Sequence, residues 1–237
     1  MALDTHEKMT AGTFDPAAGY DIASEDYDSW HWSRFWVANE VPEVLPLLRK
    51  VKNGTVLDAG CGTGRYCPLI RTTKHDYIGA DVSRRMVEIN ARKASRDVAN
   101  TNFVVADIRR LPLKAHSIEA VLCARVLSHV EDLISPLAEF RRVLKRGGLC
   151  ILTDVHSEHP YQYTKIPTSR GEVAIDTFKH TPRTLIEAFH HFEEYEILQF
   201  QSYKLGDLRV SPPRQQFGKI YLSPDNPIFW ICLLRIR

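Results

Sequence analysis

The chain has 237 residues, 44% hydrophobic and 25% charged, a composition typical of one soluble α/β domain with a sizeable core. Its 31 basic and 29 acidic residues leave a net charge of +2 without blocks of like charge, which argues against a nucleic-acid partner. No apolar run is long enough to cross a bilayer, and the first residues lack a signal peptide's apolar core, so we expect a cytoplasmic protein without a membrane span.

The N-terminal fifth of the chain is expected to be a flexible tail followed by a helical lid. Residues 1–20 mix polar, charged and small types, which favours a loose segment. Residues 21–52 begin with an aromatic-rich stretch and predict a helix over Ser33–Lys52 that is broken or bent near Pro42 and Pro46. We expect residues 21–237 to form a single domain with residues 21–52 as its lid.

From Gly54 onward, short apolar runs alternate with amphipathic segments. Strands are predicted at Thr55–Ala59, Tyr77–Asp81, Asn102–Ala106, Ala120–Ala124 and Gly148–Asp154. Helices are predicted at Gly64–Thr72, Ser83–Ser95 and Asp132–Leu144. This alternation indicates a parallel sheet with helices on both faces.

The alternation stops after Asp154, and two polar insertions are expected on the substrate side of the domain. The first spans residues 155–180 and includes a hairpin within Gly171–Phe178, and the second spans residues 204–227 and is rich in proline. The remaining elements are a helix over Pro182–Phe192 and strands at Tyr195–Tyr203 and Phe229–Ile236.

The central motif is Val56–Gly64, VLDAGCGTG, in which a buried strand enters a glycine-rich turn that opens a helix. Glycine accepts positive φ and has no Cβ to block a ligand lying against the backbone, and the N–H groups at a helix start attract a carboxylate. Asp81 ends the next strand, where an acid in a doubly wound fold accepts hydrogen bonds from ribose hydroxyls. Arg65 replaces the third glycine of the Gly-x-Gly-x-x-Gly pattern, which disfavours a nicotinamide-dependent oxidoreductase.

Over roughly Gly54–Asp154 the chain resembles the class I S-adenosylmethionine (SAM)-dependent methyltransferases, among them the ubiquinone-type and natural-product enzymes. The resemblance rests on four segments: Val56–Gly64, Gly79–Ser83 (GADVS), Val105–Ile108 (VADI) and Val143–Gly148 (VLKRGG). It implies a Rossmann-like α/β fold with a seven-stranded, mostly parallel sheet. The last strand would be antiparallel, and Phe229–Ile236 would supply it.

The resemblance also implies SAM as cofactor, S-adenosylhomocysteine as product, and a set of cofactor contacts. These are Tyr27, Asp58, Gly60, Cys61, Gly62, Gly64, Asp81, Val82, Met86, Asp107, Ile108 and Ala124. The glycines would line the methionine end and Asp81 would hold the ribose, while Val82, Met86, Asp107 and Ile108 would surround the adenine. The alternatives are a glycine turn without a ligand, a surface role for Asp107 and a core role for Met86.

Two aromatic and histidine features bear on catalysis. Trp32, Phe35 and Trp36 share one helix face. We favour the interpretation that this face packs on the core. Alternatively, the face belongs to a lid that closes over SAM, with Tyr27 near the sulfonium or the carboxylate of SAM. His129 and His156 follow the fourth and fifth strands and are the candidate general bases. Either histidine could instead contact the cofactor or orient a loop.

We expect O- or N-methylation of a small molecule. Cys123 and Ala124 stand where catechol-type methyltransferases place a magnesium-binding aspartate, and no Cys/His spacing suggests zinc, so no metal is expected. The five scattered cysteines predict reduced, mostly buried thiols. A rival hypothesis is a SAM-binding protein that promotes a cyclisation or rearrangement or acts as a non-catalytic subunit. A homodimer is an open expectation.

Overall fold

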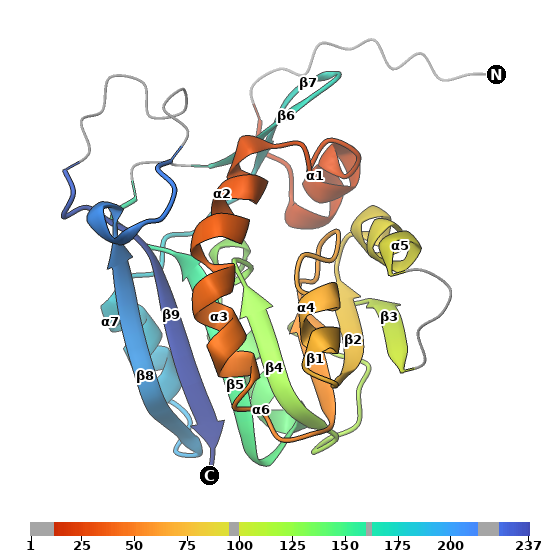
Figure 1. The fold of residues 1–237 in the computed structure, drawn as a ribbon, viewed down its shortest axis with the longest axis vertical. Helices are drawn as coiled ribbons and strands as arrows, with labels where there is room; N and C mark the ends of the chain where they lie inside the picture. Colours follow the sequence, from red (N-terminus) through yellow and green to blue (C-terminus); the bar gives the residue numbers. More distant parts are fainter. Residues whose placement is uncertain (1–11, 95–99, 160–162, 213–222) are drawn as a thin grey trace.

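The structure is a computed structural model that describes residues 12–94, 100–159, 163–212 and 223–237. Seven strands form one sheet in the order β3-β2-β1-β4-β5-β9-β8 (Figure 1). Their bounds are β1 Thr55–Ala59, β2 Asp76–Asp81, β3 Thr101–Val105, β4 Ile118–Ala124, β5 Leu144–Val155, β8 Tyr195–Lys204 and β9 Pro227–Ile236. The first five strands pair in parallel, and β9 runs antiparallel between β5 and β8. The predicted antiparallel last strand is confirmed.

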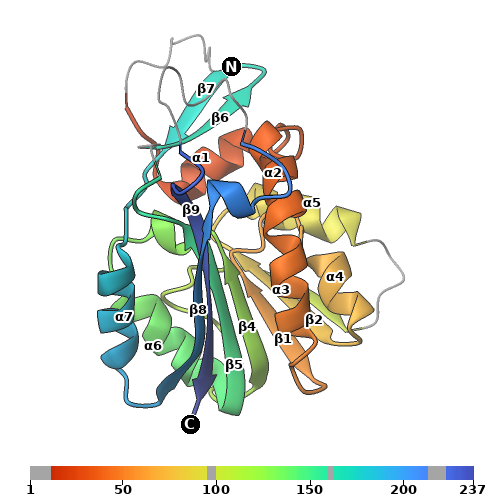
Figure 2. The same ribbon diagram turned by 60° about the vertical axis from the view of Figure 1, so that its left-hand side comes forward.

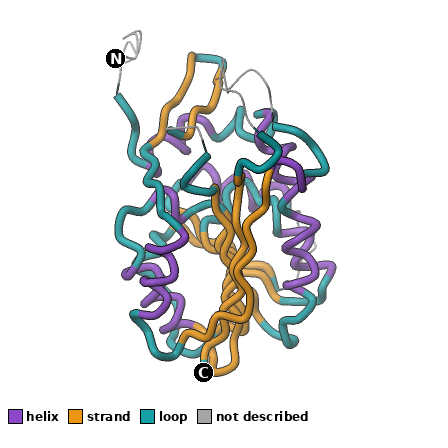
Figure 3. Tube along the Cα trace, turned by 90° about the vertical axis from the view of Figure 1, so that its left-hand side faces the viewer, coloured by secondary structure: helices purple, strands orange, loops and turns teal. Residues whose placement is uncertain are grey.

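Helices cover both faces of the sheet. They are α1 Pro16–Ala23, α2 His31–Asn39, α3 Val41–Leu48, α4 Cys67–Thr72, α5 Arg84–Lys93, α6 Ile134–Val143 and α7 Pro182–His190. Figures 1 and 2 place α3, α4 and α5 on one face and α6 and α7 on the other, and Figure 3 shows the sheet edge-on between the two layers. No helix among the described residues is long and apolar enough to pass through a bilayer.

The strands are apolar because the sheet is buried on both sides. Neighbouring strand residues point to opposite faces, so Val56 belongs to the core under α3 and α4 and Leu57 to the core under α6. The aromatic face of α2 also packs into the first of these cores, as we favoured: Trp32, Phe35 and Trp36 are each at most 5% exposed. All five cysteines are free and buried, as predicted.

Three helix predictions need correction. Residues 16–20 are not loose, because Asp15 caps α1 and Pro16 opens it; residues 1–11 lie outside the described residues. The expected helix Ser33–Lys52 is broken near Pro42, as one of the two alternatives predicted, but its two parts, α2 and α3, begin at His31 and end at Leu48 and meet at Glu40. The helix after the glycine loop begins at Cys67 and not at Gly64, because Gly64 has a left-handed φ of +92°.

The expected hairpin lies earlier in the chain than Gly171–Phe178. Its strands are β6 Thr164–Thr168 and β7 Gly171–Ile175, and it stands above α1 in Figures 1 and 2. The N-terminal segment joins it, because Phe14 N–H donates to the Ala174 carbonyl at 2.8 Å and Asp176 N–H donates to the Phe14 carbonyl at 3.0 Å. A segment expected to be loose therefore holds the hairpin against the domain.

A buried carboxylate attaches the N-terminal helices to the sheet. Glu40 is 0% exposed and lies at the α2–α3 junction. Its Oε2 accepts a hydrogen bond from the Tyr66 hydroxyl at 2.8 Å, and its Oε1 accepts one from the Thr153 hydroxyl of β5. The same Oε2 lies 3.6 Å from Nη1 of Arg65 and 3.6 Å from Nε of Arg125. One side chain thus links the lid helices to the glycine loop, β4 and β5.

Replacing this carboxylate should destabilise the whole domain. Glu40→Gln leaves two largely buried guanidinium groups without their counter-ion, so we expect the free energy of unfolding to fall by about 3 kcal/mol in urea titrations. The control is Glu187→Gln, which removes an exposed i,i+4 ion pair with Arg183 and should change stability by about 0.5 kcal/mol or less. Equal effects of the two substitutions would contradict the anchoring role of Glu40.

Candidate active site

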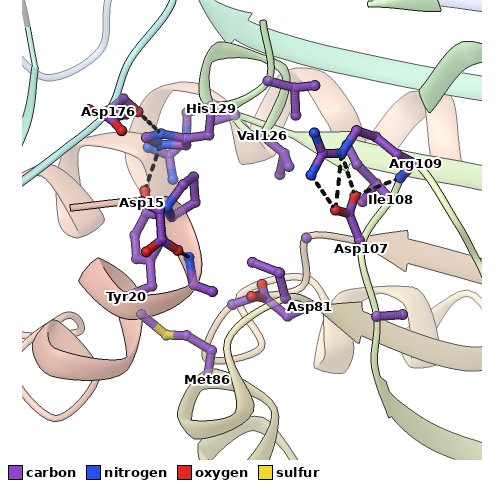
Figure 4. A pocket seen from close by; sticks show the side chains of 18 of the residues that line it. Asp15, Tyr20, Asp81, Met86, Asp107, Ile108, Arg109, Val126, His129 and Asp176 are labelled. Atoms are coloured by element: carbon purple, nitrogen blue, oxygen red, sulfur yellow. Dashed lines mark hydrogen bonds and ion pairs between the residues drawn. The ribbon is translucent and has the colours of Figure 1, made fainter. Parts of the chain in front are cut away.

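A cavity of about 360 Å³ opens at the carboxyl ends of the parallel strands (Figure 4). Of the residues predicted as site residues, ten line it: Tyr27, Gly60, Gly62, Asp81, Val82, Met86, Asp107, Ile108, Ala124 and His129. Asp58, Cys61, Gly64 and His156 lie outside the lining. Residues from α1 and from the segment after β7, which the sequence did not single out, complete the wall, among them Tyr20 and Asp176.

The three loop glycines serve different purposes. Gly62 has φ +51°, and a Cβ there would meet no atom within 4 Å, so its backbone faces open space in the cavity. A Cβ on Gly60 would instead lie 2.1 Å from Val126, and one on Gly64 would lie 2.1 Å from Oδ1 of Asn90. Gly62 therefore leaves room for a ligand, whereas Gly60 and Gly64 allow the loop to pack against its neighbours.

Asp81 combines burial with a position on the cavity wall. Its Oδ2 accepts a hydrogen bond from the Gly62 N–H at 2.8 Å, and its Oδ1 accepts one from the Ser83 N–H at 2.9 Å. Burial raises the pKa of this carboxyl to about 6, against the opposing effect of these backbone bonds. An ionised carboxylate offers about four acceptor positions, so Asp81 can hold the loop and still accept bonds from a ligand.

Asp107 lies across the cavity from α1 in a strong ion pair (Figure 4). Both of its oxygens accept from Nε of Arg109 at 3.0 Å, and Oδ2 also accepts from Nη2 at 2.6 Å. The hydrogen bonds from Arg109 lower the pKa of the Asp107 carboxyl, which therefore stays ionised. A ligand amino group at this end would have to share the carboxylate with Arg109.

Asp58 and Cys61 support the glycine loop from behind. Asp58 is 1% exposed and accepts a hydrogen bond from the Tyr77 hydroxyl at 2.9 Å. Burial raises the pKa of Asp58 to about 7 and also raises the pKa of the Cys61 thiol. Both residues belong to the predicted motif, but their side chains point into the protein.

Arg125 is a cavity residue that the sequence analysis missed. Its guanidinium lies 4.6 Å from the centre of the Trp36 ring and 3.4 Å from the Tyr27 hydroxyl. Burial would raise the pKa of the Tyr27 phenol, but the charges of Arg125 and Arg65 outweigh it and lower that pKa. Arg125 also has φ +57°, an uncommon conformation for a residue with a Cβ. A charged residue directly after an apolar strand is the signal that could have identified it.

The segment that precedes α2 forms polar contacts with the glycine loop beside these residues. Asp28 accepts a hydrogen bond from the Thr63 hydroxyl at 2.6 Å and forms an ion pair with Lys93 of α5. The Lys93 ammonium also donates to the Thr63 carbonyl at 3.0 Å. These contacts hold Tyr27, the neighbour of Asp28, over the methionine end of the expected cofactor site.

His129 forms a hydrogen-bonded line with Tyr20 and Asp176 on the α1 side of the cavity (Figure 4). Its Nε2 lies 2.8 Å from the Tyr20 hydroxyl, and its Nδ1 lies 2.7 Å from the Asp176 carbonyl oxygen. Burial lowers the pKa of the imidazole to about 4. The ring is therefore neutral at physiological pH.

The other histidines lie outside the cavity lining. His156 is 6% exposed, and its backbone N–H donates to the Ile228 carbonyl at 2.9 Å. His180 is half-buried and places Nε2 2.8 Å from the Val130 carbonyl and 3.1 Å from that of Leu127. Because carbonyls only accept, His180 donates and holds the turn that carries His129.

Part of the chain matches a family of known proteins. Residues 57–152 match the family model for a methyltransferase domain. The chain is 31% identical over 110 residues to a malonyl-[acyl-carrier protein] O-methyltransferase of Hamiltonella defensa, covering 46% of this chain and 41% of that one. It is 34% identical over 155 residues to a ubiquinone/menaquinone biosynthesis C-methyltransferase of Desulfotalea psychrophila, covering 62% and 57%. Residues 57–152 therefore carry a methyltransferase domain, and the chain is similar to class I SAM-dependent methyltransferases.

The fold of this methyltransferase domain recurs in solved structures. A SAM-dependent methyltransferase from Thermotoga maritima superposes with a TM-score of 0.65 at 22% identity, covering 93% of this chain and 99% of that one. The chain spans about half the length of the two curated relatives, 41% and 57%. SAM is the cofactor of this family, and three features of the cavity fit it: the open space at Gly62, the acceptor capacity of Asp81 and the cation of Arg125.

Asp81 should make cofactor binding dependent on pH. Below a pKa of about 6 the carboxyl is protonated and loses its charge, so SAM affinity should fall by up to tenfold per pH unit below pH 6. Asp81→Asn should weaken binding at pH 8 by about 30-fold or more, a loss of about 2–3 kcal/mol, and should flatten the pH profile between pH 5 and 7. Calorimetry measures both effects, and Asp76→Asn, at the opposite end of β2, is the matched control. Unchanged affinity in a folded Asp81→Asn protein would disprove the ribose role.

Proposed function

We propose that this protein is a SAM-dependent methyltransferase that transfers a methyl group to an oxygen or nitrogen atom of a small molecule. The observation that carries the proposal is the layout of the cavity, in which the cofactor-type residues Gly62 and Asp81 share one space with a neutral histidine, His129. Bound SAM supplies an activated methyl group on a sulfonium. The protein must then orient the acceptor, exclude water and receive the acceptor's proton.

In this proposal, different residues of the chain contact different parts of the cofactor. Gly60 and Gly62 border its methionine end, where Tyr27 and the Arg125 guanidinium offer a hydroxyl and a positive charge to a carboxylate. Asp81 would accept bonds from the ribose hydroxyls. At the adenine end, Val82, Met86, Asp107 and Ile108 form the wall.

His129 is the candidate base because a neutral imidazole has a lone pair to receive a proton. His156 lies outside the cavity wall, so its role as a base stays a prediction and is not part of this proposal. A cavity of about 360 Å³ suits a small acceptor that reaches in beside the cofactor. The cytoplasmic location, the single-domain organisation and the homodimer stay predictions.

The test begins with calorimetric titration of the protein with SAM and with S-adenosylhomocysteine, for which we expect micromolar binding of both. Release of S-adenosylhomocysteine is then measured with phenols, carboxylic acids and primary amines as acceptors. His129→Gln should lower turnover by about 100-fold or more with little change in SAM affinity, because a base acts on the chemical step. The matched control, His190→Gln, alters an exposed residue of α7 and should change neither.

The same experiments distinguish the proposed methyl transfer from the rival hypothesis, in which the protein binds SAM but transfers no methyl group. A protein that binds SAM but releases no S-adenosylhomocysteine with any acceptor would favour the non-methylating use of the cofactor. Absence of SAM binding to the folded protein would contradict both hypotheses. Equal losses of turnover and SAM affinity in His129→Gln would assign His129 to cofactor binding or folding.

A further inference from the structure

The hydrogen bonds around His129 define which of its nitrogens carries a hydrogen. Nδ1 lies 2.7 Å from the Asp176 carbonyl oxygen, and a carbonyl can only accept, so Nδ1 carries the hydrogen and donates it. Because the ring is neutral, Nε2 has a lone pair. The Tyr20 hydroxyl, 2.8 Å away, must therefore donate to Nε2.

This assignment places the Tyr20 hydroxyl on the proton-accepting nitrogen of His129. The lone pair of Nε2, the one position at which His129 can take up a proton, is already occupied by the Tyr20 hydroxyl. Tyr20 lines the cavity, and a phenol oxygen that donates one hydrogen can still accept others. An acceptor hydroxyl or ammonium can therefore donate a hydrogen bond to the Tyr20 oxygen without displacing the hydrogen bond from Tyr20 to His129.

Three separate segments hold this line of hydrogen bonds from Tyr20 through His129 to Asp176, here called the relay, in place. Tyr20 comes from α1, His129 from the turn after β4, and Asp176 from the segment after β7. The Asp176 backbone is fixed by its hydrogen bond to Phe14, and its carboxylate accepts one from the Thr13 hydroxyl. The rings of Tyr20 and His129 meet edge to face, with centroids 5.3 Å apart and an interplanar angle of 89°. The alignment thus depends on the packing of α1 and the hairpin.

We propose that Tyr20 is a catalytic residue that receives the acceptor's proton and passes its own phenolic proton to His129. This inference rests on the proposed methyl transfer. As the acceptor's lone pair forms the new bond to the methyl carbon, the electron pair of the carbon–sulfur bond goes to sulfur. The acceptor's proton moves to the Tyr20 oxygen, the Tyr20 proton moves to Nε2, and the positive charge comes to rest on the imidazolium, whose Nδ1–H still donates to Asp176. Solvent later takes the proton.

The charges around the relay bear on its titration. The titratable and charged groups that line the same cavity are Asp15, Tyr27, Asp81, Asp107, Arg109, Arg125, Glu131 and Asp176. Burial is the main effect that keeps His129 neutral, the Arg125 charge adds to it, and Asp176 opposes it. A relay that is neutral at rest can take up a proton over the whole physiological pH range.

The first test needs neither cofactor nor acceptor. Nitrogen-15 NMR of labelled histidine in the ligand-free protein should show His129 with a protonated Nδ1 and a bare, hydrogen-bonded Nε2. Tyr20→Phe should shift the Nε2 resonance, because its donor is removed, and leave Nδ1 protonated. Tyr203→Phe, which alters β8 outside the cavity lining, should move neither resonance. A protonated Nε2, or an Nε2 resonance unaffected by Tyr20→Phe, would overturn the proposal.

The second test separates proton transfer from positioning. Phenol and 4-nitrophenol serve as probe acceptors, at a pH where phenol, with a pKa of about 10, keeps its proton and the nitrophenol is ionised. Tyr20→Phe should lower kcat on phenol by about 100-fold or more and on nitrophenolate by about threefold or less, with SAM affinity unchanged. An equal loss on both phenols would show that Tyr20 only positions the acceptor.

The two proposals fail in different ways. A wild-type protein that binds no SAM, or that releases no S-adenosylhomocysteine with any of the phenols, carboxylic acids or amines, contradicts the proposed methyl transfer. A wild-type protein that methylates both phenols, together with a Tyr20→Phe variant that does so at the same rates, contradicts the relay alone. Circular dichroism of each variant checks that the fold is intact.

Discussion

The architecture depends on the neutralisation of one buried carboxylate. Glu40 is fully enclosed, and an isolated charge in such a place would cost several kcal/mol. Arg65, Arg125 and the hydroxyls of Tyr66 and Thr153 balance it, and they come from three places: the end of the glycine loop, the end of β4, and β5. The helices on either side of Glu40 can therefore pack in only one place. That place brings α2 and α3 against the glycine loop and fixes one end of the cavity.

The same charge cluster shapes the chemistry of the cavity. Arg125 is held in a strained left-handed conformation because its backbone N–H donates to the Thr153 carbonyl at 2.7 Å while its guanidinium is shared among Trp36, Tyr27 and Glu40. Its positive charge favours ionisation of Tyr27 and disfavours protonation of His129. Arg125, which helps to hold α2 and α3 in place through Glu40, thereby also contributes to the pKa shifts of Tyr27 and His129 on the cavity wall.

Local sequence predicted those parts of the site that short motifs specify. The glycine loop and Asp81 follow from a strand, a turn and a strand end that are close in sequence, and the structure brings Gly60, Gly62 and Asp81 to the wall of one cavity. Side-chain direction was harder to predict, since Asp58 belongs to the same motif yet turns toward Tyr77. Tyr20 was missed because its partner His129 lies 109 positions away and because the Asp15-Pro16 pair, a helix-start signal, was read as part of a loose tail.

Histidine chemistry shows why residue type alone is a poor guide to a base. His129 was a candidate base because an imidazole ordinarily titrates near neutrality. Burial lowers the pKa of His129 to about 4, so this histidine is a weak base in its resting state. A weak base becomes effective when the proton donor grows more acidic as the reaction proceeds, as a hydroxyl or amine does while it gains a methyl group and positive charge. The enclosed, carbonyl-oriented imidazole then stays ready to accept the proton and is not protonated beforehand by solvent. This favours acceptors whose proton is released during methyl transfer over those already ionised in water.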